Sequence, residues 1–166
     1  MRDAKAIVDI YNEYVVNSVA TFETEPLRVE EMEGRIAGIS ASYPYLVYVD
    51  QDEVVGYCYA HTWKEKAAYK YTLETTVYLS PRYKGKGIGR QLMERLIEEC
   101  RAGGYHALIA CITNEGHTFI PSGDNYFELD NRVVFRKVSH FEKVGLKFGR
   151  WLDVVDYELI IKPNER

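Results

Sequence analysis

The chain has 166 residues, of which 46% are hydrophobic and 28% are charged, with 12 Gly and 5 Pro. These values are typical of one globular domain over residues 1–166 and exclude collagen-like, disordered and coiled-coil chains. The formal net charge of −4 does not favour nucleic-acid binding. No apolar stretch reaches the roughly 20 residues of a membrane-spanning helix. The three cysteines are too few and too scattered for a disulfide framework or a zinc site, so we expect a cytoplasmic protein without a metal.

Hydrophobic spacing predicts the elements in chain order. The first half is predicted to contain two helices and then an antiparallel hairpin, over residues 3–17, 28–39, 43–50 and 53–62. The second half is predicted to contain a strand over 70–79, a helix whose apolar face runs from Leu92 to Cys100 and which ends at Gly103-Gly104, and three strands over 106–112, 135–141 and 153–161. The strand–helix–strand unit predicts a right-handed parallel crossover. We therefore expect an α/β (α+β) fold, with a single mixed sheet flanked by helices.

A glycine-rich loop separates the strand over 70–79 from the following helix. Its glycines allow positive φ and a close approach of the backbone to a ligand, while the helix N-terminus supplies unpaired N–H groups and partial positive charge. Four cations accompany these glycines without an acid among them: Arg82, Lys84, Lys86 and Arg90. The combination predicts an anion site suited to a pyrophosphate. The alternative is a solvated, glycine-rich turn that only begins a helix.

Two nucleotide-binding motifs do not fit this loop. There is no Gly-x-x-x-x-Gly-Lys-Ser/Thr run, and Arg90 stands where a dinucleotide fingerprint needs its last glycine. The run instead matches Arg-x-x-Gly-x-Gly at Arg82, Gly85 and Gly87. It resembles the acyl-CoA pyrophosphate motif of the GCN5-related N-acetyltransferases (GNAT). The resemblance covers nearly the whole chain and extends to the phosphinothricin/methionine sulfoximine acetyltransferase branch, through residues 12–26, 56–60, 68–71, 74–78 and 144–153.

The resemblance implies transfer of an acetyl group from acetyl-CoA to the α-amino group of a small amino acid or analogue. It also implies a GNAT fold with a splayed sheet and, commonly in this branch, a homodimer. The residues that it assigns to acetyl-CoA binding lie on the strand, on the glycine loop and after the next strand: Val77, Tyr78, Leu79, Arg82, Lys84, Gly85, Lys86, Gly87, Ile88, Gly89, Arg90 and Asn114.

The chemistry needs a base, because an ammonium group cannot attack a thioester until it loses a proton. Glu74 is the one acid in the predicted strand, and alternation places it with Thr76 and Tyr78 on the more polar face. The resemblance places the branch's general base at this position, whereas the alternative is an exposed surface glutamate. It also implies that backbone N–H groups at Val77–Leu79 stabilise the oxyanion, where the strand diverges from its neighbour.

The sequence departs from the family pattern in two places. Many members carry a tyrosine or histidine acid on a helix after the fifth strand, but residues 115–134 do not match that pattern and do not indicate a helix. Tyr126 is the candidate general acid that this segment offers. The family also usually opens with a strand before the first helix, and the resemblance implies that this strand is missing here.

Acceptor contacts are implied at three places in the chain. Phe22 and Glu23 lie in the loop that walls the acceptor site in this branch, and Tyr71 and Thr72 flank the expected base. Lys147 and Arg150 are candidates to pair with a substrate carboxylate. Core packing for Phe22 and solvated charges for the two cations are the alternatives. Two other functions also stay open: an acyl-CoA-binding protein with weak or lost catalysis, and an acetyltransferase for a polyamine, an aminoglycoside or a protein N-terminus.

Overall fold

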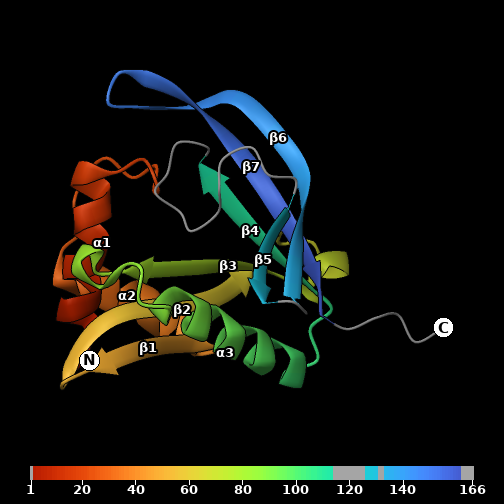
Figure 1. The fold of residues 1–166 in the computed structure, drawn as a ribbon, viewed down its shortest axis with the longest axis horizontal. Coiled ribbons are helices and arrows are strands. Elements are labelled where there is room, and N and C mark those ends of the chain that lie inside the picture. Colours follow the sequence, from red (N-terminus) through yellow and green to blue (C-terminus); the bar gives the residue numbers. More distant parts are fainter. Residues whose placement is uncertain (1, 114–125, 131–132, 162–166) are drawn as a thin grey trace.

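A computed structural model describes residues 2–113, 126–130 and 133–161. The strands form one mixed sheet of seven strands in the order β1-β2-β3-β4-β7-β6-β5 (Figure 1). The helices are α1 (Ala4–Asn17), α2 (Val29–Ser40) and α3 (Ile88–Ala102), with short 3₁₀ turns η1 (Ala67–Tyr69) and η2 (Pro81–Tyr83). The strands are β1 (Tyr45–Asp50), β2 (Glu53–Thr62), β3 (Thr72–Leu79), β4 (Ala107–Thr113), β5 (Tyr126–Asp130), β6 (Val133–Lys147) and β7 (Arg150–Ile160). The predicted mixed sheet with flanking helices is confirmed.

Two apolar clusters hold the helices on opposite faces of the sheet. The amphipathic helix α3 buries one stripe at helical spacing, which includes Leu92 and Leu96, against β-strand residues such as Leu73 and Leu108. On the other face, α1 and α2 cover the buried Tyr57 and its aromatic neighbours. Alternating side chains of β2 and β3 therefore supply both clusters. None of the described helices is long and apolar enough to cross a membrane.

The pairing of β3 with its neighbours positions the site. β3 is antiparallel to β2 along its whole length, from Thr62↔Leu73 to Gly56↔Leu79. Its parallel pairing with β4 is shorter, because the register runs from Thr72↔Ala107 only to Thr75↔Ala110. Beyond that last pair β4 continues beside β7 while β3 diverges from it. The sheet is thus split between β3 and β4, as the resemblance implied.

The C-terminal strands are longer than the sequence indicated. The predicted strands over 135–141 and 153–161 are parts of a long hairpin, in which β6 and β7 continue to a turn at Phe148 and Gly149, both with positive φ. The register is interrupted between Phe141 and Gly145, where an extra segment breaks the alternation. A further strand, β5, pairs with β6 in a region for which no element was predicted.

Candidate functional site

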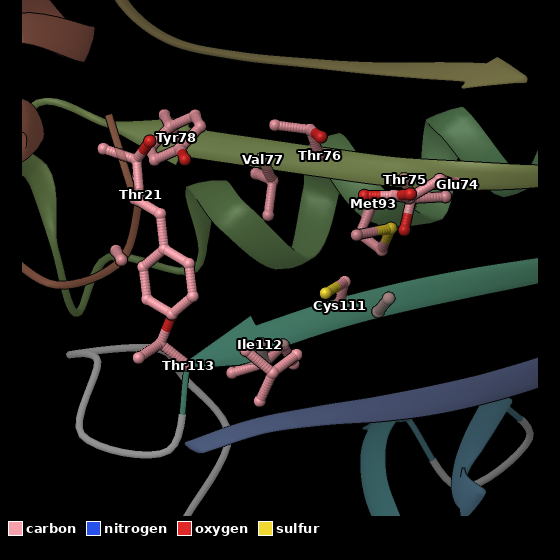
Figure 2. Close-up of a pocket in the computed structure, with 14 residues that line it drawn as sticks. Thr21, Glu74, Thr75, Thr76, Val77, Tyr78, Met93, Cys111, Ile112 and Thr113 are labelled. Atoms are coloured by element: carbon pink, nitrogen blue, oxygen red, sulfur yellow. The ribbon is translucent and has the colours of Figure 1, made fainter. Parts of the chain in front are cut away.

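A cavity of about 290 Å³ lies in the split between β3 and β4 (Figure 2). Glu74 to Tyr78 of β3 form one side, and Ala110 to Thr113 of β4 form the other. Met93 lines it from α3, whereas Ala20, Thr21 and Phe22 line it from the loop after α1. Because α1 and α3 cover opposite faces of the sheet, the cavity connects the two faces through the split. A ligand entering from the α3 side can therefore meet a second ligand entering from the α1 side.

The split exposes backbone hydrogen-bonding groups of β3. Tyr71 accepts hydrogen bonds from His106 and Ala107 at the start of β4, and the Ser80 N–H donates to Val55 at the start of β2. Since backbone groups alternate sides along a strand, the N–H and C=O of Val77 point towards β4. The register with β4 has already ended at Thr75, so no described β4 residue pairs with Val77. This edge can donate to and accept from an extended ligand.

Glu74 contributes the one charged side chain among the residues described as lining the cavity. It lies opposite His61 in the β2–β3 register, on the face that also carries Thr76 and Tyr78. Burial raises the pKa of Glu74 above its usual value, the neighbouring His61 lowers it, and the negative charge of Asp156 raises it further. The carboxylate is consequently a stronger base than an exposed glutamate. The predicted face of the strand is confirmed.

The glycine loop forms an open cradle at the N-terminus of α3. Gly85 and Gly87 have φ values of 76° and 77°, and a Cβ atom at either position would have no neighbour within 4 Å. Gly87 is the N-cap of α3, whose first residues Ile88 and Gly89 are buried. Backbone N–H groups of the first helical turn have no partner within the helix and carry partial positive charge. The residues present therefore fit a pyrophosphate.

The four cations of this loop make different contacts. Arg82 lies on η2, with its guanidinium 3.6 Å from the Glu53 carboxylate. Lys84 and Lys86 lie over aromatic rings, those of Tyr14 and Tyr83, at 5.2 and 4.6 Å from the ring centroids. Arg90 forms a 2.8 Å ion pair with Glu94 one turn further along α3. These are exposed contacts of low energy, so the cations can reorient towards an anion.

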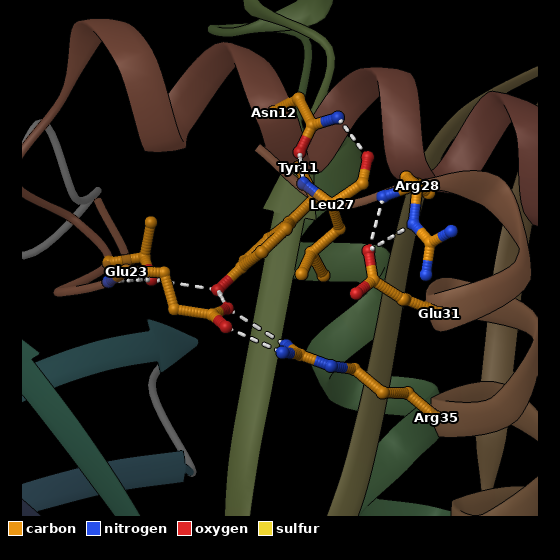
Figure 3. A network of polar contacts seen from close by, with 8 residues as sticks. Tyr11, Asn12, Glu23, Leu27, Arg28, Glu31 and Arg35 are labelled. Carbon is orange, nitrogen blue, oxygen red and sulfur yellow. Dashed lines mark hydrogen bonds and ion pairs between the residues drawn. The ribbon is translucent and has the colours of Figure 1, made fainter. Parts of the chain in front are cut away.

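The loop after α1 is held by polar contacts in its middle and near its end (Figure 3). Arg35 of α2 donates to both oxygens of Glu23 at 2.8 and 2.5 Å, and Tyr11 also donates to this carboxylate. The Arg35 hydrogen bonds lower the pKa of Glu23. Near the end of the loop, the Asn12 amide exchanges two 2.9 Å hydrogen bonds with the backbone of Leu27. Glu23 is thus committed to holding the loop, and of the two predicted residues only Phe22 lines the cavity.

Lys147 corrects a prediction. Lys147 is not the solvated loop charge of the alternative interpretation, because the residue is only 2% exposed. Its ammonium group donates to the backbone oxygens of Ser18 and Thr21 at 2.7 Å each and to that of Tyr14 at 3.4 Å. An ammonium has three protons to donate, and these three carbonyls use them. It therefore has no donor left for a substrate carboxylate.

The other predicted acceptor residues lie outside the described lining of the cavity. Arg150 is exposed and begins β7 at the hairpin turn. Tyr71 is exposed just before β3, and Thr72 pairs with Ala107 at the far end of the parallel ladder.

The candidate general acid, Tyr126, begins the strand β5, so the segment is not a helix there, in line with the sequence. Asn114 and most of the atypical segment 115–134 lie outside the described residues.

Several cavity residues were not predicted from the sequence. Thr76 shares the face of Glu74, which strand alternation indicates, but the sequence carries no signal for Thr21 or Cys111. Cys111 lies close to Asp156, and burial together with this carboxylate raises the thiol pKa to about 12. Burial likewise raises the pKa of Cys58 to about 12 and that of Cys100 to about 11. No group of three metal-ligating side chains lies within the described part of the chain.

Comparison with known proteins decides which family this architecture represents. Residues 1–155 match the acetyltransferase (GNAT) domain family. The chain belongs to the GNAT acetyltransferase family. It is therefore an acyltransferase whose cosubstrate is acetyl-CoA, and the cradle at Gly85 and Gly87 fits the pyrophosphate of that molecule.

Two acetyltransferases are similar to this GNAT chain over most of its length. It is 36% identical over 154 residues to a phosphinothricin N-acetyltransferase of Alcaligenes faecalis, covering 92% of this chain and 75% of the relative. It is 34% identical over 161 residues to an L-methionine sulfoximine/L-methionine sulfone acetyltransferase of Salmonella typhimurium, covering 95% and 88% of the two chains.

Solved structures agree with this placement. The putative acetyltransferase yncA of Salmonella typhimurium, solved with its cofactor acetyl-CoA, has a TM-score of 0.89 and 30% identity, covering 99% of this chain and 92% of the other. A phosphinothricin acetyltransferase of Sinorhizobium meliloti, in complex with acetyl-CoA, has a TM-score of 0.84 and 34% identity, covering 99% and 89%. The fold and the family are thus supported over almost the whole chain.

Proposed function

We propose that this GNAT protein transfers the acetyl group of acetyl-CoA to the α-amino group of a small amino acid or analogue, with Glu74 as the general base. The observation that carries the proposal is the position of Glu74, a half-buried carboxylate in the cavity where β3 and β4 separate. The substrate class is supported by relatives named for phosphinothricin and methionine sulfoximine. We place the whole of residues 1–166 in one acetyltransferase domain that works in the cytoplasm, where three free cysteines would stay reduced.

The reaction follows from the chemistry of the described groups. Glu74 takes a proton from the acceptor ammonium, either directly or through a water molecule, and the free amine attacks the thioester carbonyl. The new C–N bond forms, the C–S bond breaks, and the sulfur leaves with the bonding electrons as CoA thiolate. The second proton that the nitrogen loses on becoming an amide passes to this thiolate, directly or through water. The Val77 N–H points into the split and can donate to the carbonyl oxygen as negative charge develops there. The cradle at Gly85 and Gly87 holds the pyrophosphate throughout.

An acceptor panel tests this proposal. Thiol release from acetyl-CoA would be followed with phosphinothricin, methionine sulfoximine, methionine, other amino acids and spermidine. Turnover confined to the amino-acid class supports the proposal, while turnover with spermidine alone moves the protein to another acceptor class. If CoA raises the Tm but no amine is acetylated, the protein is an acyl-CoA-binding member of the family without efficient catalysis.

We also propose that the protein is a homodimer in which the β6–β7 hairpin contributes to the interface. Leu146 and Trp151 face each other across the hairpin, yet they are 55% and 61% exposed. Phe141, Val144 and Phe148 add exposed apolar area on the same arm. Clustered exposed apolar side chains of this size are typical of protein interfaces.

Sedimentation equilibrium tests this assembly. Wild-type protein is expected at twice the 19.2 kDa chain mass, and Trp151→Glu is expected to shift it towards the single-chain mass because a charge would be buried in the interface. Val49→Glu, at an exposed apolar position on the edge strand β1, is the control and should leave the mass unchanged. A wild-type monomer, or a Trp151→Glu dimer of unchanged affinity, would contradict the proposal.

A further inference from the structure

We propose that Lys147, on the β6–β7 hairpin, is a positioning residue that holds the acceptor wall of the cavity in place. The acceptor wall is the part of the loop after α1 that lines the cavity: Ala20, Thr21 and Phe22. The inference rests on the proposed function, because that function makes the Glu74 side of the cavity the acceptor side. Lys147 touches neither the cavity nor the cradle, and it lies about 130 residues along the chain from the loop that it binds. Its hydrogen bonds to the backbone of that loop nevertheless fix the position of the loop.

The first support is the geometry of the Lys147 ammonium group. Tyr14 belongs to the last turn of α1, Ser18 follows the helix, and Thr21 lines the cavity, so the three acceptor carbonyls span the exit from α1 and the wall itself. A cation at a helix C-terminus interacts favourably with the helix dipole. In a buried setting these charge-assisted bonds fix the backbone more firmly than exposed ones would.

The second support is the neighbouring glycine on the same strand face. Gly145 lies two residues before Lys147, so its missing side chain and the Lys147 side chain share one side of β6. A Cβ atom at Gly145 would lie only 2.2–2.9 Å from three ring carbons of Phe22. Phe22 itself lines the cavity. The hairpin therefore seats the wall at two adjacent points, with Lys147 on the backbone of Thr21 and Gly145 under the ring of Phe22.

The third support is that the acceptor wall and the pyrophosphate cradle lie on opposite faces of the sheet. Its residues come from the α1 face of the sheet, whereas the pyrophosphate cradle lies at the N-terminus of α3. Arg35 and Tyr11 already hold the middle of the same loop through Glu23 (Figure 3). Lys147 fixes the start of the loop through Ser18 and Thr21. A displaced wall would thus change acceptor binding without changing the cradle.

The test compares Lys147→Met with Lys143→Met, an exposed lysine on the same hairpin. Lys147→Met is expected to raise the KM of the acceptor at least tenfold while the KM of acetyl-CoA stays within twofold, and Lys143→Met is expected to change neither. Hydrogen exchange provides a readout that needs no turnover. Amides of residues 18–23 should exchange at least tenfold faster in Lys147→Met, with α3 and β3 unchanged. An unchanged acceptor KM, or unchanged exchange of the loop, overturns the proposal.

A second variant keeps the proposal testable if Lys147→Met does not fold. Gly145→Ala must displace the Phe22 ring, which is 40% exposed and has room to move, so this chain is expected to fold. Gly145→Ala should raise the KM of the acceptor and speed up the amide exchange of residues 18–23. Gly38→Ala, where a Cβ has open space, should change neither the KM nor the exchange. If the wild-type protein acetylates no amine, the proposed function fails, and the exchange data still decide whether Lys147 and Gly145 hold the loop.

Discussion

Glu74→Gln is expected to lower kcat by about 10²–10⁴-fold, the usual contribution of a positioned general base. Glutamine keeps the shape of the side chain but cannot accept the ammonium proton. The KM of acetyl-CoA is expected to stay within twofold, because the cradle at Gly85 and Gly87 belongs to a different segment. Steady-state kinetics with the best acceptor of the panel would measure both values.

The pH dependence separates a base from a merely structural carboxylate. Burial and the charge of Asp156 raise the pKa of Glu74, although His61 opposes them. The protonated form is inactive as a base, so kcat/KM should fall as the pH drops through this raised pKa, at a higher pH than for an exposed glutamate near 4.3. At alkaline pH a growing fraction of the acceptor is already free amine. The deficit of Glu74→Gln should therefore shrink as the pH rises.

Glu158→Gln is the matched control for this experiment. Glu158 pairs with Ile109, which in turn pairs with Glu74, so both glutamates lie in one row across the sheet. Glu158 is ion-paired with Arg136 and does not belong to the described cavity lining. Its variant is expected to keep wild-type kcat. If Glu74→Gln retained more than half of the wild-type kcat at neutral pH, Glu74 would not be the base.

Gly87→Ala is expected to raise the KM of acetyl-CoA about tenfold, because an alanine in the left-handed region costs roughly 1–2 kcal/mol. The residue is the N-cap of α3 with a φ of 77°, and relief of the strain would turn the N–H groups of the cradle away from the anion. The KM of the acceptor is expected to change little. Initial rates with acetyl-CoA varied at saturating acceptor would measure the effect.

Gly104→Ala controls for strain alone. Gly104 also has a positive φ, of 83°, and a Cβ atom there would meet open space, but it follows the opposite end of α3. Both variants are expected to lose a similar amount of Tm, and only Gly87→Ala should weaken acetyl-CoA binding. Equal effects of the two variants on the KM of acetyl-CoA would show that the loop acts through stability rather than through contact with the anion.

Local patterns predicted much of this fold because local physics decides those elements. Apolar spacing located the three helices, and the strand over 53–62 agrees with β2 at both ends. The turn at Gln51 and Asp52, both with positive φ, joins the first hairpin where the sequence indicated it. The glycine loop was predicted for the same reason, because its glycines and cations are adjacent in the chain.

The remaining features depend on partners that are distant in the sequence. From the sequence alone Lys147 is indistinguishable from a solvated cation, because its partners lie in α1 and the following loop. Glu23 is likewise indistinguishable from an unpaired acid, because its partner Arg35 lies on α2. The extension of β6 and β7 was missed because Lys143 adopts a positive φ within an interrupted register, which destroys strand alternation. No local pattern carries such information, and only the folded chain reveals these contacts.

The cysteines of the protein have a practical consequence for measuring its chemistry. A reagent that detects thiols reacts with the thiolate form, and a thiol with a pKa of about 12 has only about one part in 10⁵ as thiolate at pH 7. Cys58, with a pKa near 12, and Cys100, with a pKa near 11, are also buried, whereas Cys111 has a raised pKa but is exposed. The released CoA, with an ordinary thiol pKa of about 8.5, has a thiolate fraction roughly 300 to 3,000 times larger. Cys58 and Cys100 would therefore add to the colour reaction only when the protein unfolds, and a sample without acceptor would measure what the exposed Cys111 contributes beside the released CoA.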